Sequence, residues 1–286
     1  MKIIKEIKEC KKVVAGLKTQ RQVIGLVPTM GYLHEGHLSL ARLADQDCDT
    51  VFMTIFVNPT QFGPGEDFEK YPRDLKRDTA LAESAGVDYI FAPEAEEIYR
   101  KENGTSVEVE GLSRPMCGKQ RPGHFRGVAT IVLKLFNIIP ADRAYFGEKD
   151  YQQLAVIKKM VSDLDLDIEI VAGPTVREED GLALSSRNKY LSGQERKNAP
   201  VIYRTLKEAK KSIEDGEEDL DIIKKQAARK IRGTLHVKSM DYFDIRDAET
   251  LEEINTAKGD RDILIATAAW FGGTRLIDNI VIKRKK

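Results

Sequence analysis

Two histidines three residues apart, His34 and His37, follow a short apolar run and a turn in the first part of the chain. Val23–Val27 is long enough for a buried strand, and Pro28 and Gly31 then interrupt the run. The apolar-periodic segment that follows predicts a helix with both imidazoles in its first turn and on one face. Free backbone N–H groups and the positive end of the helix dipole lie there, so this arrangement favours a bound phosphate.

Other interpretations of the histidine pair stay open at this point. The two side chains could be solvated, could cap the helix, or could form half of a zinc site. The metalloprotease motif His-Glu-x-x-His is absent, because the second histidine comes three rather than four residues after the first. Contact with a bound phosphate is favoured over these alternatives.

Alternating strand and helix patterns that could position these histidines cover the first part of the chain. Strand patterns continue at Thr50–Val57, Val87–Ala92, Ala144–Phe146 and Ile168–Val171, and helix patterns occur at Pro72–Gly86, Val128–Ile139 and Tyr151–Leu164. This succession predicts an α/β fold, a Rossmann-like parallel sheet with crossover helices. We also expect a short strand at Ser106–Val109. The stripe of Ile3, Ile4 and Ile7 fits an amphipathic helix or a strand followed by a helix.

The last part of the chain has a different pattern, and Pro174 marks the boundary. Two charge-rich amphipathic helices are predicted at Gln194–Glu214 and Asp219–Arg232, and strands at Val237–Ile245, Asp262–Phe271 and Leu276–Ile282. Gly272-Gly273 is a hairpin signal between the last two strands. We therefore expect a Rossmann-like domain at 1–175 and a smaller α+β domain at 176–286.

Polar residues follow several predicted strands, at the edge where open α/β sheets bind ligands. Asn58 and Gln61 carry uncharged amides that suit hydroxyl and carboxylate groups, although an ordinary turn capped by Asn58 is the alternative. Lys149 stands at the start of a helix, where a cation is favourable if an anion is bound beside it. The Ser-Ser-Arg group at 185–187 suits phosphate oxygens, but it is weak on its own.

Composition argues against several functional classes. The 286 residues include 46 basic and 46 acidic side chains, so the net charge is zero and a nucleic-acid or membrane-surface role is disfavoured. No apolar run is long enough for a transmembrane helix, and the charged N-terminus is not a signal peptide. Cys10, Cys48 and Cys117 form no Cys-x-x-Cys pair, which favours a reducing, cytoplasmic location. The basic loop Arg114–Gly127 could face an anion or be solvated.

Five stretches carry a resemblance to a known family. They are PTMGYLHEGH at 28–37, FVNPTQF at 56–62, RPGHFRGV at 121–128, YFGEKDYQQ at 145–153 and LSSRN at 184–188. In this order and spacing they resemble the pantothenate synthetases, or pantoate–β-alanine ligases, along the whole chain. The histidine stretch is similar to the H-I-G-H motif of class I aminoacyl-tRNA synthetases and related nucleotidyltransferases, and LSSRN stands where their K-M-S-K-S loop stands.

The resemblance implies two half-reactions that rely on positioning and charge stabilisation. The carboxylate of pantoate attacks the α-phosphorus of ATP, giving pantoyl adenylate and pyrophosphate. The amine of β-alanine then displaces AMP, giving pantothenate. Mg²⁺ is expected to accompany ATP, held mainly by phosphate oxygens and not by a protein cage. Domain 1–175 would bind ATP and pantoate, domain 176–286 would close over the active site, and the enzyme would be a cytoplasmic homodimer.

The resemblance also assigns residues to roles. His34, His37 and Lys149 would be catalytic, with His37 matching the proton donor assigned in the family, although both histidines suit hydrogen-bond donation to phosphate charge better. Gln61 and Gln153 would bind pantoate, and Gln61 would also contact β-alanine. The ATP contacts would be Met30, Gly31, Tyr32, Leu33, His34, Glu35, Gly36, His37, Gly147, Glu148, Lys149, Asp150, Val176, Leu184, Ser185, Ser186 and Arg187.

Two rival functions remain to be tested. A plain nucleotidyltransferase would stop at an adenylylated product, and it would not need the pair Gln61 and Gln153. An RNA-binding protein could use the basic loop and the basic tail Lys283–Lys286, but the zero net charge and the lack of an aromatic-basic stripe argue against it. We therefore expect small-molecule substrates and neither nucleic acid nor a membrane as partner.

Overall fold

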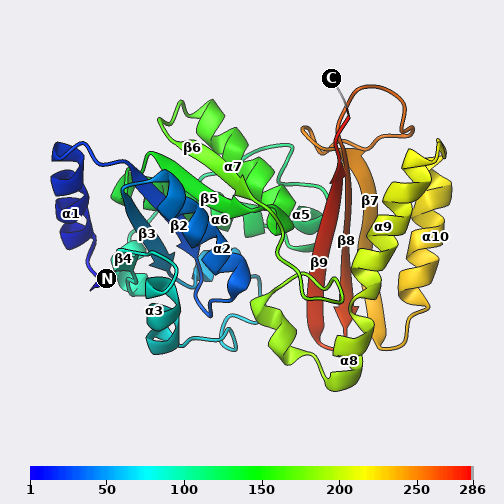
Figure 1. Cartoon of the computed structure of the whole chain (residues 1–286), viewed down its shortest axis with the longest axis horizontal. Helices are drawn as coiled ribbons and strands as arrows, with labels where there is room; N and C mark the ends of the chain where they lie inside the picture. Colours follow the sequence, from blue (N-terminus) through cyan, green and yellow to red (C-terminus); the bar gives the residue numbers. More distant parts are fainter. Residues whose placement is uncertain (285–286) are drawn as a thin grey trace. The chain divides into compact units, whose positions relative to one another are not determined.

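The computed structural model describes residues 1–284, which form two compact units (Figure 1). The first unit comprises Met1–Ser113, Arg121–Glu148 and Gln153–Pro174, and the second comprises Arg114–Gln120, Lys149–Gln152 and the chain from Thr175 onwards. The last two residues of the basic tail named above, Lys285 and Lys286, lie outside the described residues. Among the described residues, no helix has the length and apolar character needed to cross a membrane.

A six-stranded parallel sheet forms the centre of the first unit, in the order β1-β4-β3-β2-β5-β6. Its strands are β1 (Lys2–Ile4), β2 (Ile24–Thr29), β3 (Thr50–Ile55), β4 (Tyr89–Phe91), β5 (Arg143–Gly147) and β6 (Glu169–Gly173). The predicted parallel α/β sheet is thereby confirmed. The chain leaves β2 toward β3 on one side and returns to β5 on the other, so the loops after β2 and β5 flank the switch point where such sheets bind ligands.

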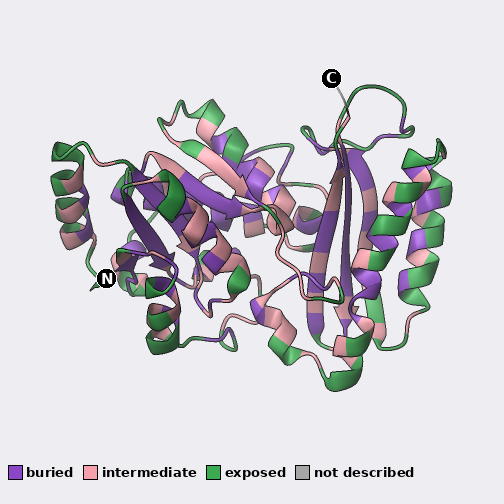
Figure 2. Cartoon of the chain, viewed as in Figure 1, coloured by how far each residue is buried: buried purple, intermediate pink, exposed green. Residues whose placement is uncertain are grey.

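Crossover helices cover the strands of this unit, as the alternating pattern predicts. They are α1 (Ile7–Thr19), α2 (Glu35–Asp47), α3 (Leu75–Glu83), α4 (Ala95–Ile98), α6 (His124–Ile138) and α7 (Tyr151–Asp163), with the 3-10 turns η1 (Pro59–Gln61) and η2 (Glu148–Asp150). The last two residues of η2 and the first two of α7 belong to the second unit. The inner strands β2, β3, β4 and β5 are mostly buried, whereas the edge strands β1 and β6 are partly exposed (Figure 2). Val27 and Met53 of the sheet belong to one buried apolar cluster with Leu38 and Ala41 of α2. That cluster anchors the start of α2 against the end of β2.

The second unit contains a three-stranded antiparallel sheet in the order β7-β8-β9. Its elements are β7 (Val237–Asp247), β8 (Ile263–Phe271), β9 (Thr274–Ile282), α5 (Cys117–Gln120), η3 (Ser186–Tyr190), α8 (Gly193–Asn198), α9 (Val201–Glu214) and α10 (Leu220–Arg232). The predicted hairpin is present, with Phe271 paired to Thr274 across Gly272-Gly273. The amphipathic helices α9 and α10 bury one face and expose the other (Figure 2).

Two sequence predictions about local structure were wrong. Residues 194–214 form two helices and not one, because Pro200 has no N–H to continue the hydrogen-bond ladder of α8. Ser106–Val109 is not a strand, since the N–H of Val107 donates to the hydroxyl of Thr130 on α6 at 2.9 Å instead of to a neighbouring strand.

Several element boundaries also differ from the prediction by a few residues. Helix α6 begins at His124, four residues earlier than expected, directly after Gly123 with φ of 83°. The N-terminal isoleucine stripe forms a strand followed by a helix, and its strand β1 pairs with β4 at the edge of the sheet. Strand β3 ends at Ile55, two residues earlier than predicted, so the loop that follows it begins at residue 56.

Candidate active site

The turn between β2 and α2 has a sharply bent backbone. Gly31 and Tyr32 have φ values of 80° and 50°, in the left-handed region that favours glycine. A Cβ on Gly31 would lie 2.9 Å from Cγ2 of Ile55, so only glycine fits there without a shift. The carboxylate of Asp78, a residue that the sequence did not single out, accepts hydrogen bonds from the N–H groups of Tyr32 and Leu33.

The two histidines form a capping box at the start of α2. His34 is the N-cap and lies just outside the helix, not within its first turn as predicted, and His37 is the third helical residue. Nδ1 of His34 accepts the N–H of Gly36 at 3.2 Å, and Nδ1 of His37 accepts the N–H of His34 at 3.3 Å. The ring centroids are 4.0 Å apart.

These contacts determine which ring nitrogen carries the hydrogen. Because each Nδ1 accepts a backbone hydrogen bond, the neutral form of each ring has its hydrogen on Nε2. A Cβ on Gly36 would lie 3.0 Å from Nδ1 of His34, so a glycine at this position leaves the cap undisturbed. Two adjacent Nε2–H donors at the N-terminus of a 13-residue helix suit an anionic oxygen.

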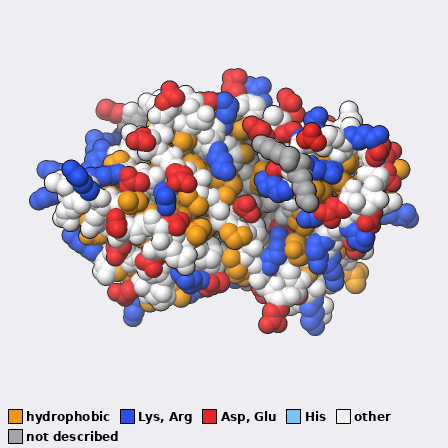
Figure 3. Space-filling view, turned by 45° about the horizontal axis from the view of Figure 1, so that its top comes forward, with side chains coloured by type: hydrophobic (Ala, Val, Ile, Leu, Met, Phe, Trp, Pro, Cys, Tyr) orange, Lys and Arg blue, Asp and Glu red, His pale blue; other side chains and the backbone are white. Residues whose placement is uncertain are grey.

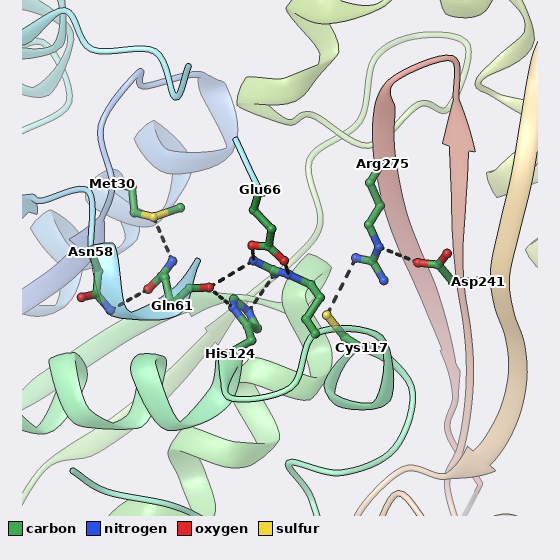
Figure 4. A network of polar contacts seen from close by, with 9 residues as sticks. Met30, Asn58, Gln61, Glu66, Cys117, His124, Asp241 and Arg275 are labelled. Carbon is green, nitrogen blue, oxygen red and sulfur yellow. Dashed lines mark hydrogen bonds and ion pairs between the residues drawn. The ribbon is translucent and has the colours of Figure 1, made fainter. Parts of the chain in front are cut away.

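Gln61 is buried in η1, in the loop after β3, and its amide is oriented by Asn58 (Figure 4). Nδ2 of Asn58 donates to Oε1 of Gln61 and to the carbonyl oxygen of Gly127, each at 3.1 Å. Since a main-chain carbonyl can only accept, the Asn58 amide has one orientation, and Gln61 must direct its Nε2 the other way. There Nε2 donates to Sδ of Met30 at 2.9 Å, a weak acceptor that a substrate oxygen can replace.

Further contacts fix Asn58 itself. Its Oδ1 accepts the hydroxyl of Tyr99 at 2.8 Å and that of Thr60 at 3.0 Å. Burial raises the pKa of Tyr99, which keeps this hydroxyl protonated as a donor. Helix α6 approaches η1 so closely that a Cβ on Gly127 would lie 2.3 Å from the carbonyl oxygen of Thr60. The side-chain amide of Asn58 is therefore fixed through both its oxygen and its nitrogen, and it orients the amide of Gln61.

The main chain of Gln61 is held by residues of the RPGHFRGV stretch (Figure 4). Its carbonyl oxygen accepts from Nδ1 of His124 at 2.8 Å and from Nη2 of Arg121 at 3.2 Å. Glu66 pairs with Arg121 through contacts of 2.7 and 2.6 Å. Burial acts to raise the pKa of Glu66, but the hydrogen bonds and charge of Arg121 outweigh it and the pKa is lowered. The carboxylate thus stays ionised and keeps Arg121 in place.

In the second unit, Lys149 is held through its main chain. Nδ2 of Asn279, buried in β9, donates to the carbonyl oxygen of Lys149 at 2.9 Å. The side chain of Lys149 is 18% exposed, and its Nζ lies 3.7 Å from a carboxylate oxygen of Asp150. A cationic side chain that is mostly buried suits an anionic ligand.

The predicted ATP contacts Val176 and Leu184 to Arg187 lie on one continuous loop of the second unit. The N–H of Leu184 donates to the carbonyl oxygen of Val176 at 3.0 Å, and this hydrogen bond closes the loop formed by residues 176–184. Ser185 then caps η3 by accepting the N–H of Arg187 at 3.3 Å, and Ser186 is buried. The family resemblance assigns Val176 to adenine and the other four residues to the triphosphate, and the loop brings all five together.

A buried ion pair braces this loop, and the sequence did not reveal it. The guanidinium of Arg177 contacts both carboxylate oxygens of Asp278 on β9, at 2.6 and 2.9 Å. The same group stacks 3.6 Å above the ring centroid of Tyr203 on α9 and donates to the carbonyl oxygen of Gly181. This bidentate pair, in which Arg177 is 16% and Asp278 is 3% exposed, holds the loop against strand β9.

The two glutamines at the start of α7 have different roles. Gln152 is buried and structural, since its Nε2 donates to the carbonyl oxygen of Pro115 at 2.8 Å and its Oε1 accepts the N–H of Cys117. Gln153 is half-buried and forms no side-chain hydrogen bond within the described part of the chain. Its amide is thus available to a ligand.

The two units divide the predicted site residues between them. The first holds Met30, Gly31, Tyr32, Leu33, His34, Glu35, Gly36, His37, Gln61, Gly147, Glu148 and Gln153. The second holds Lys149, Asp150, Val176, Leu184, Ser185, Ser186 and Arg187. Within the first unit, Met30 links the histidine turn to Gln61, while Glu35 points instead to an ion pair with Arg42.

A second polar network lies in the antiparallel sheet (Figure 4). The carboxylate of Asp241 on β7 accepts Nε of Arg275 at 2.7 Å and Nε1 of Trp270 at 2.9 Å. Nη1 of Arg275 also contacts Sγ of Cys117, at 3.8 Å. These contacts tie α5 to the sheet of the second unit.

Comparison with known proteins identifies the family. The family described as Pantoate-beta-alanine ligase matches residues 2–281. The chain belongs to this family. As a member of it, the protein is a ligase that forms an amide bond. The fold and the motifs described above are thus those of a pantoate–β-alanine ligase, and the resemblance inferred from the five stretches is confirmed.

Curated relatives and solved structures agree with this assignment. A pantothenate synthetase from Caldicellulosiruptor bescii is 55% identical over 285 residues, which cover 100% of both chains. The structure of pantothenate synthetase from Thermus thermophilus is 45% identical with a TM-score of 0.91, covering 98% of this chain and 99% of that one. A Francisella tularensis pantoate–β-alanine ligase complexed with β-γ ATP and β-alanine is 35% identical with a TM-score of 0.80, covering 98% and 97%.

Proposed function

We propose that the protein condenses pantoate with β-alanine in an ATP-dependent reaction that gives pantothenate, AMP and pyrophosphate through pantoyl adenylate. The observation that carries the proposal is the pair of Nε2–H donors of His34 and His37 at the start of α2, in a member of this ligase family. The Francisella tularensis ligase, solved in complex with β-γ ATP and β-alanine, supports the choice of substrates.

In the first half-reaction, a carboxylate oxygen of pantoate bonds to the α-phosphorus of ATP while the bond to the pyrophosphate oxygen breaks. Negative charge grows on the phosphate oxygens, and the Nε2–H groups of His34 and His37 donate to them. In the second unit, Lys149, the serines at 185–186 and Arg187 are proposed to contact the triphosphate as well. Fixed donors of this kind stabilise the transition state without reorganising when charge develops.

In the second half-reaction, the amine nitrogen of β-alanine bonds to the acyl carbon and AMP leaves with the electrons of the acyl–oxygen bond. The nitrogen gives up a proton to reach the neutral amide. Gln61 and Gln153 would hold the pantoyl group, with Nε2 of Gln61 donating to a pantoate oxygen in place of the sulfur of Met30. The main task of the protein is then to hold the reacting groups in line.

Mg²⁺ bound to ATP fits the residues present. Within residues 1–284, no group of three or more His, Cys, Asp or Glu side chains is arranged to hold a metal ion. Mg²⁺ commonly keeps its waters and binds through substrate phosphates, so we propose that the ion arrives with ATP. When bound, it would neutralise charge on the phosphate oxygens.

We also propose that the enzyme is a cytoplasmic homodimer that uses neither nucleic acid nor a membrane. The family resemblance supports the dimer, and three free cysteines support a reducing compartment. Basic and acidic side chains are interspersed on the face seen in Figure 3, which does not favour an RNA-binding surface. Light scattering on the purified protein would test the dimer, and salt-dependent RNA retention on a filter would argue for the rival binding function.

The test of the function is the release of pyrophosphate and AMP from ATP and Mg²⁺. With pantoate alone, we expect at most one pyrophosphate per active site, and adding β-alanine should give sustained AMP production. An enzyme that releases pyrophosphate repeatedly with pantoate alone and accumulates the adenylate would be a plain nucleotidyltransferase. If neither substrate stimulates release, pantoate is not the substrate.

Replacing Gln153 with alanine is expected to raise the KM for pantoate by up to about tenfold, the size of one lost hydrogen bond. The KM for ATP should change much less, because Gln153 is assigned to the pantoate group. Initial rates at varied concentrations of each substrate provide the comparison, with the ATP series as the internal control. Equal increases in both constants would show that Gln153 is misplaced in this scheme.

A further inference from the structure

Asp78 is a buried carboxylate on the inner face of α3. Its side chain is 1% exposed, and it lies on the same helix face as Leu75 and Ala82, three residues before it and four after it. A carboxylate in such a place is costly unless its oxygens are hydrogen-bonded. Oδ2 accepts the N–H of Tyr32 at 2.6 Å, and Oδ1 accepts the N–H of Leu33 at 2.8 Å.

The backbone that Asp78 holds is the strained part of the histidine turn. Tyr32 has a φ of 50° and follows Gly31 with a φ of 80°. A non-glycine residue in this region costs on the order of 1 kcal/mol and persists only where its surroundings enforce it. Two consecutive N–H groups that converge on one carboxylate supply that constraint.

Arg77, the neighbour of Asp78, completes the grip on the turn. Its Nη2 donates to the carbonyl oxygen of Leu33 at 2.9 Å, and its guanidinium lies 4.9 Å from the ring centroid of Tyr32. Its Nη1 also contacts Oδ1 of Asp78 at 3.3 Å. Both main-chain polar groups of Leu33 are therefore held by adjacent residues of α3.

We propose that Asp78 is a positioning residue for the two histidines of the active site. His34 follows Leu33 directly, and the N–H of His34 donates to the ring of His37. The backbone that Asp78 fixes therefore determines the positions of both imidazole rings. With 1% exposure the carboxylate does not contact ATP, and it acts through the turn. The role rests on the proposed function, in which these rings donate to phosphate oxygens.

The carboxylate is difficult to replace because both of its oxygens accept. Burial raises the pKa of Asp78, although the hydrogen bonds from Leu33 and Tyr32 and the charge of Arg77 act in the opposite direction. An asparagine would keep one acceptor oxygen and place an NH₂ group against the other main-chain N–H. Asp78→Asn is thus nearly isosteric and breaks one of the two contacts.

The experiment compares Asp78→Asn with Asp74→Asn. We expect Asp78→Asn to lower kcat for β-alanine-dependent AMP production about 10²-fold, the loss typical of misplaced catalytic groups, with little change in the KM for ATP. Nitrogen-15 NMR of the free protein should also show altered Nδ1 and Nε2 signals for His34 and His37. Asp74 caps the same helix by accepting the N–H of Arg77 at 3.0 Å, and asparagine caps equally well, so Asp74→Asn should match the wild type.

A folded Asp78→Asn protein with wild-type kcat and wild-type histidine signals would overturn the proposal. If that variant does not fold, Arg77→Gln replaces it, because the Arg77 side chain is 43% exposed and the substitution leaves the carboxylate of Asp78 in place while it removes the guanidinium contacts with Leu33, Tyr32 and Asp78. It should shift the same NMR signals, and unchanged signals would overturn the proposal. Absence of pantoate-dependent activity in the wild type would instead defeat the proposed function, while the NMR comparison would still decide the role of Asp78.

Discussion

Replacing His37 with alanine is expected to slow pantoyl-adenylate formation by about two to four powers of ten, the range for lost oriented donors. The Nε2–H of His37 would donate to phosphate oxygens whose charge grows as the pyrophosphate leaves. His37 also accepts the N–H of His34 in the capping box, so alanine would cost about 1 kcal/mol of unfolding free energy as well. Single-turnover pyrophosphate release measures the first effect, and thermal unfolding measures the second.

Two near-isosteric substitutions separate these roles. In His37→Asn the side-chain oxygen can take the place of Nδ1 and keep the cap, while no donor reaches the place of Nε2. In His37→Gln the amide NH₂ can reach the place of Nε2, while the cap acceptor is lost. We expect the first variant to be stable and nearly inactive, and the second to be less stable and partly active. The reverse order of activities would mean that His37 acts through the cap alone.

Replacing Lys149 with glutamine is expected to lower kcat by about 10²- to 10³-fold, the effect of removing one charge-stabilising donor. Asn279 donates to the main-chain carbonyl of Lys149, and this hydrogen bond fixes the backbone that carries the ammonium group. Lys149→Arg should recover only part of the activity, because a planar guanidinium does not reproduce the compact ammonium. Steady-state AMP production provides the measurement.

Lys159→Gln is the matched control for Lys149. Lys159 lies on α7, is half exposed and pairs with Asp163 on the surface, where such an ion pair contributes little. We expect wild-type kcat from this variant. If Lys149→Gln behaved like Lys159→Gln, with both proteins folded, Lys149 would have no part in stabilising the phosphate charge.

The parts of the fold that could be predicted from sequence are those set by local patterns. Val23–Val27 is apolar and β-branched enough to be a strand, and β2 continues through Pro28 to Thr29 before the chain bends at Gly31. Both β2 and the start of α2 were therefore found within one or two residues. The same holds for the hairpin at Gly272-Gly273. Boundaries failed where one residue altered the backbone, as at Pro200 and at Gly123 with its positive φ.

The contacts that orient the candidate site could not be predicted, because they join residues far apart in the chain. Asp78 lies 46 residues from Tyr32, and Arg121 lies 55 residues from Glu66. A single sequence does not indicate which acid faces which backbone group. The only sequence signal for Asp78 is that it is a carboxylate on the apolar face of a predicted helix. That signal does not indicate that its partners are the N–H groups of Tyr32 and Leu33.

Trp270 makes the second unit optically distinct from the first. It is the only tryptophan among the 286 residues, and its indole donates to Asp241 within the β7-β8-β9 sheet. Its fluorescence therefore monitors that sheet alone, whereas circular dichroism averages over the helices of both units. Coincident denaturation curves from the two signals would mean that the units unfold as one cooperative block, and separated curves would give each unit its own stability. The native protein thus carries a built-in label for measuring how strongly its two halves are coupled.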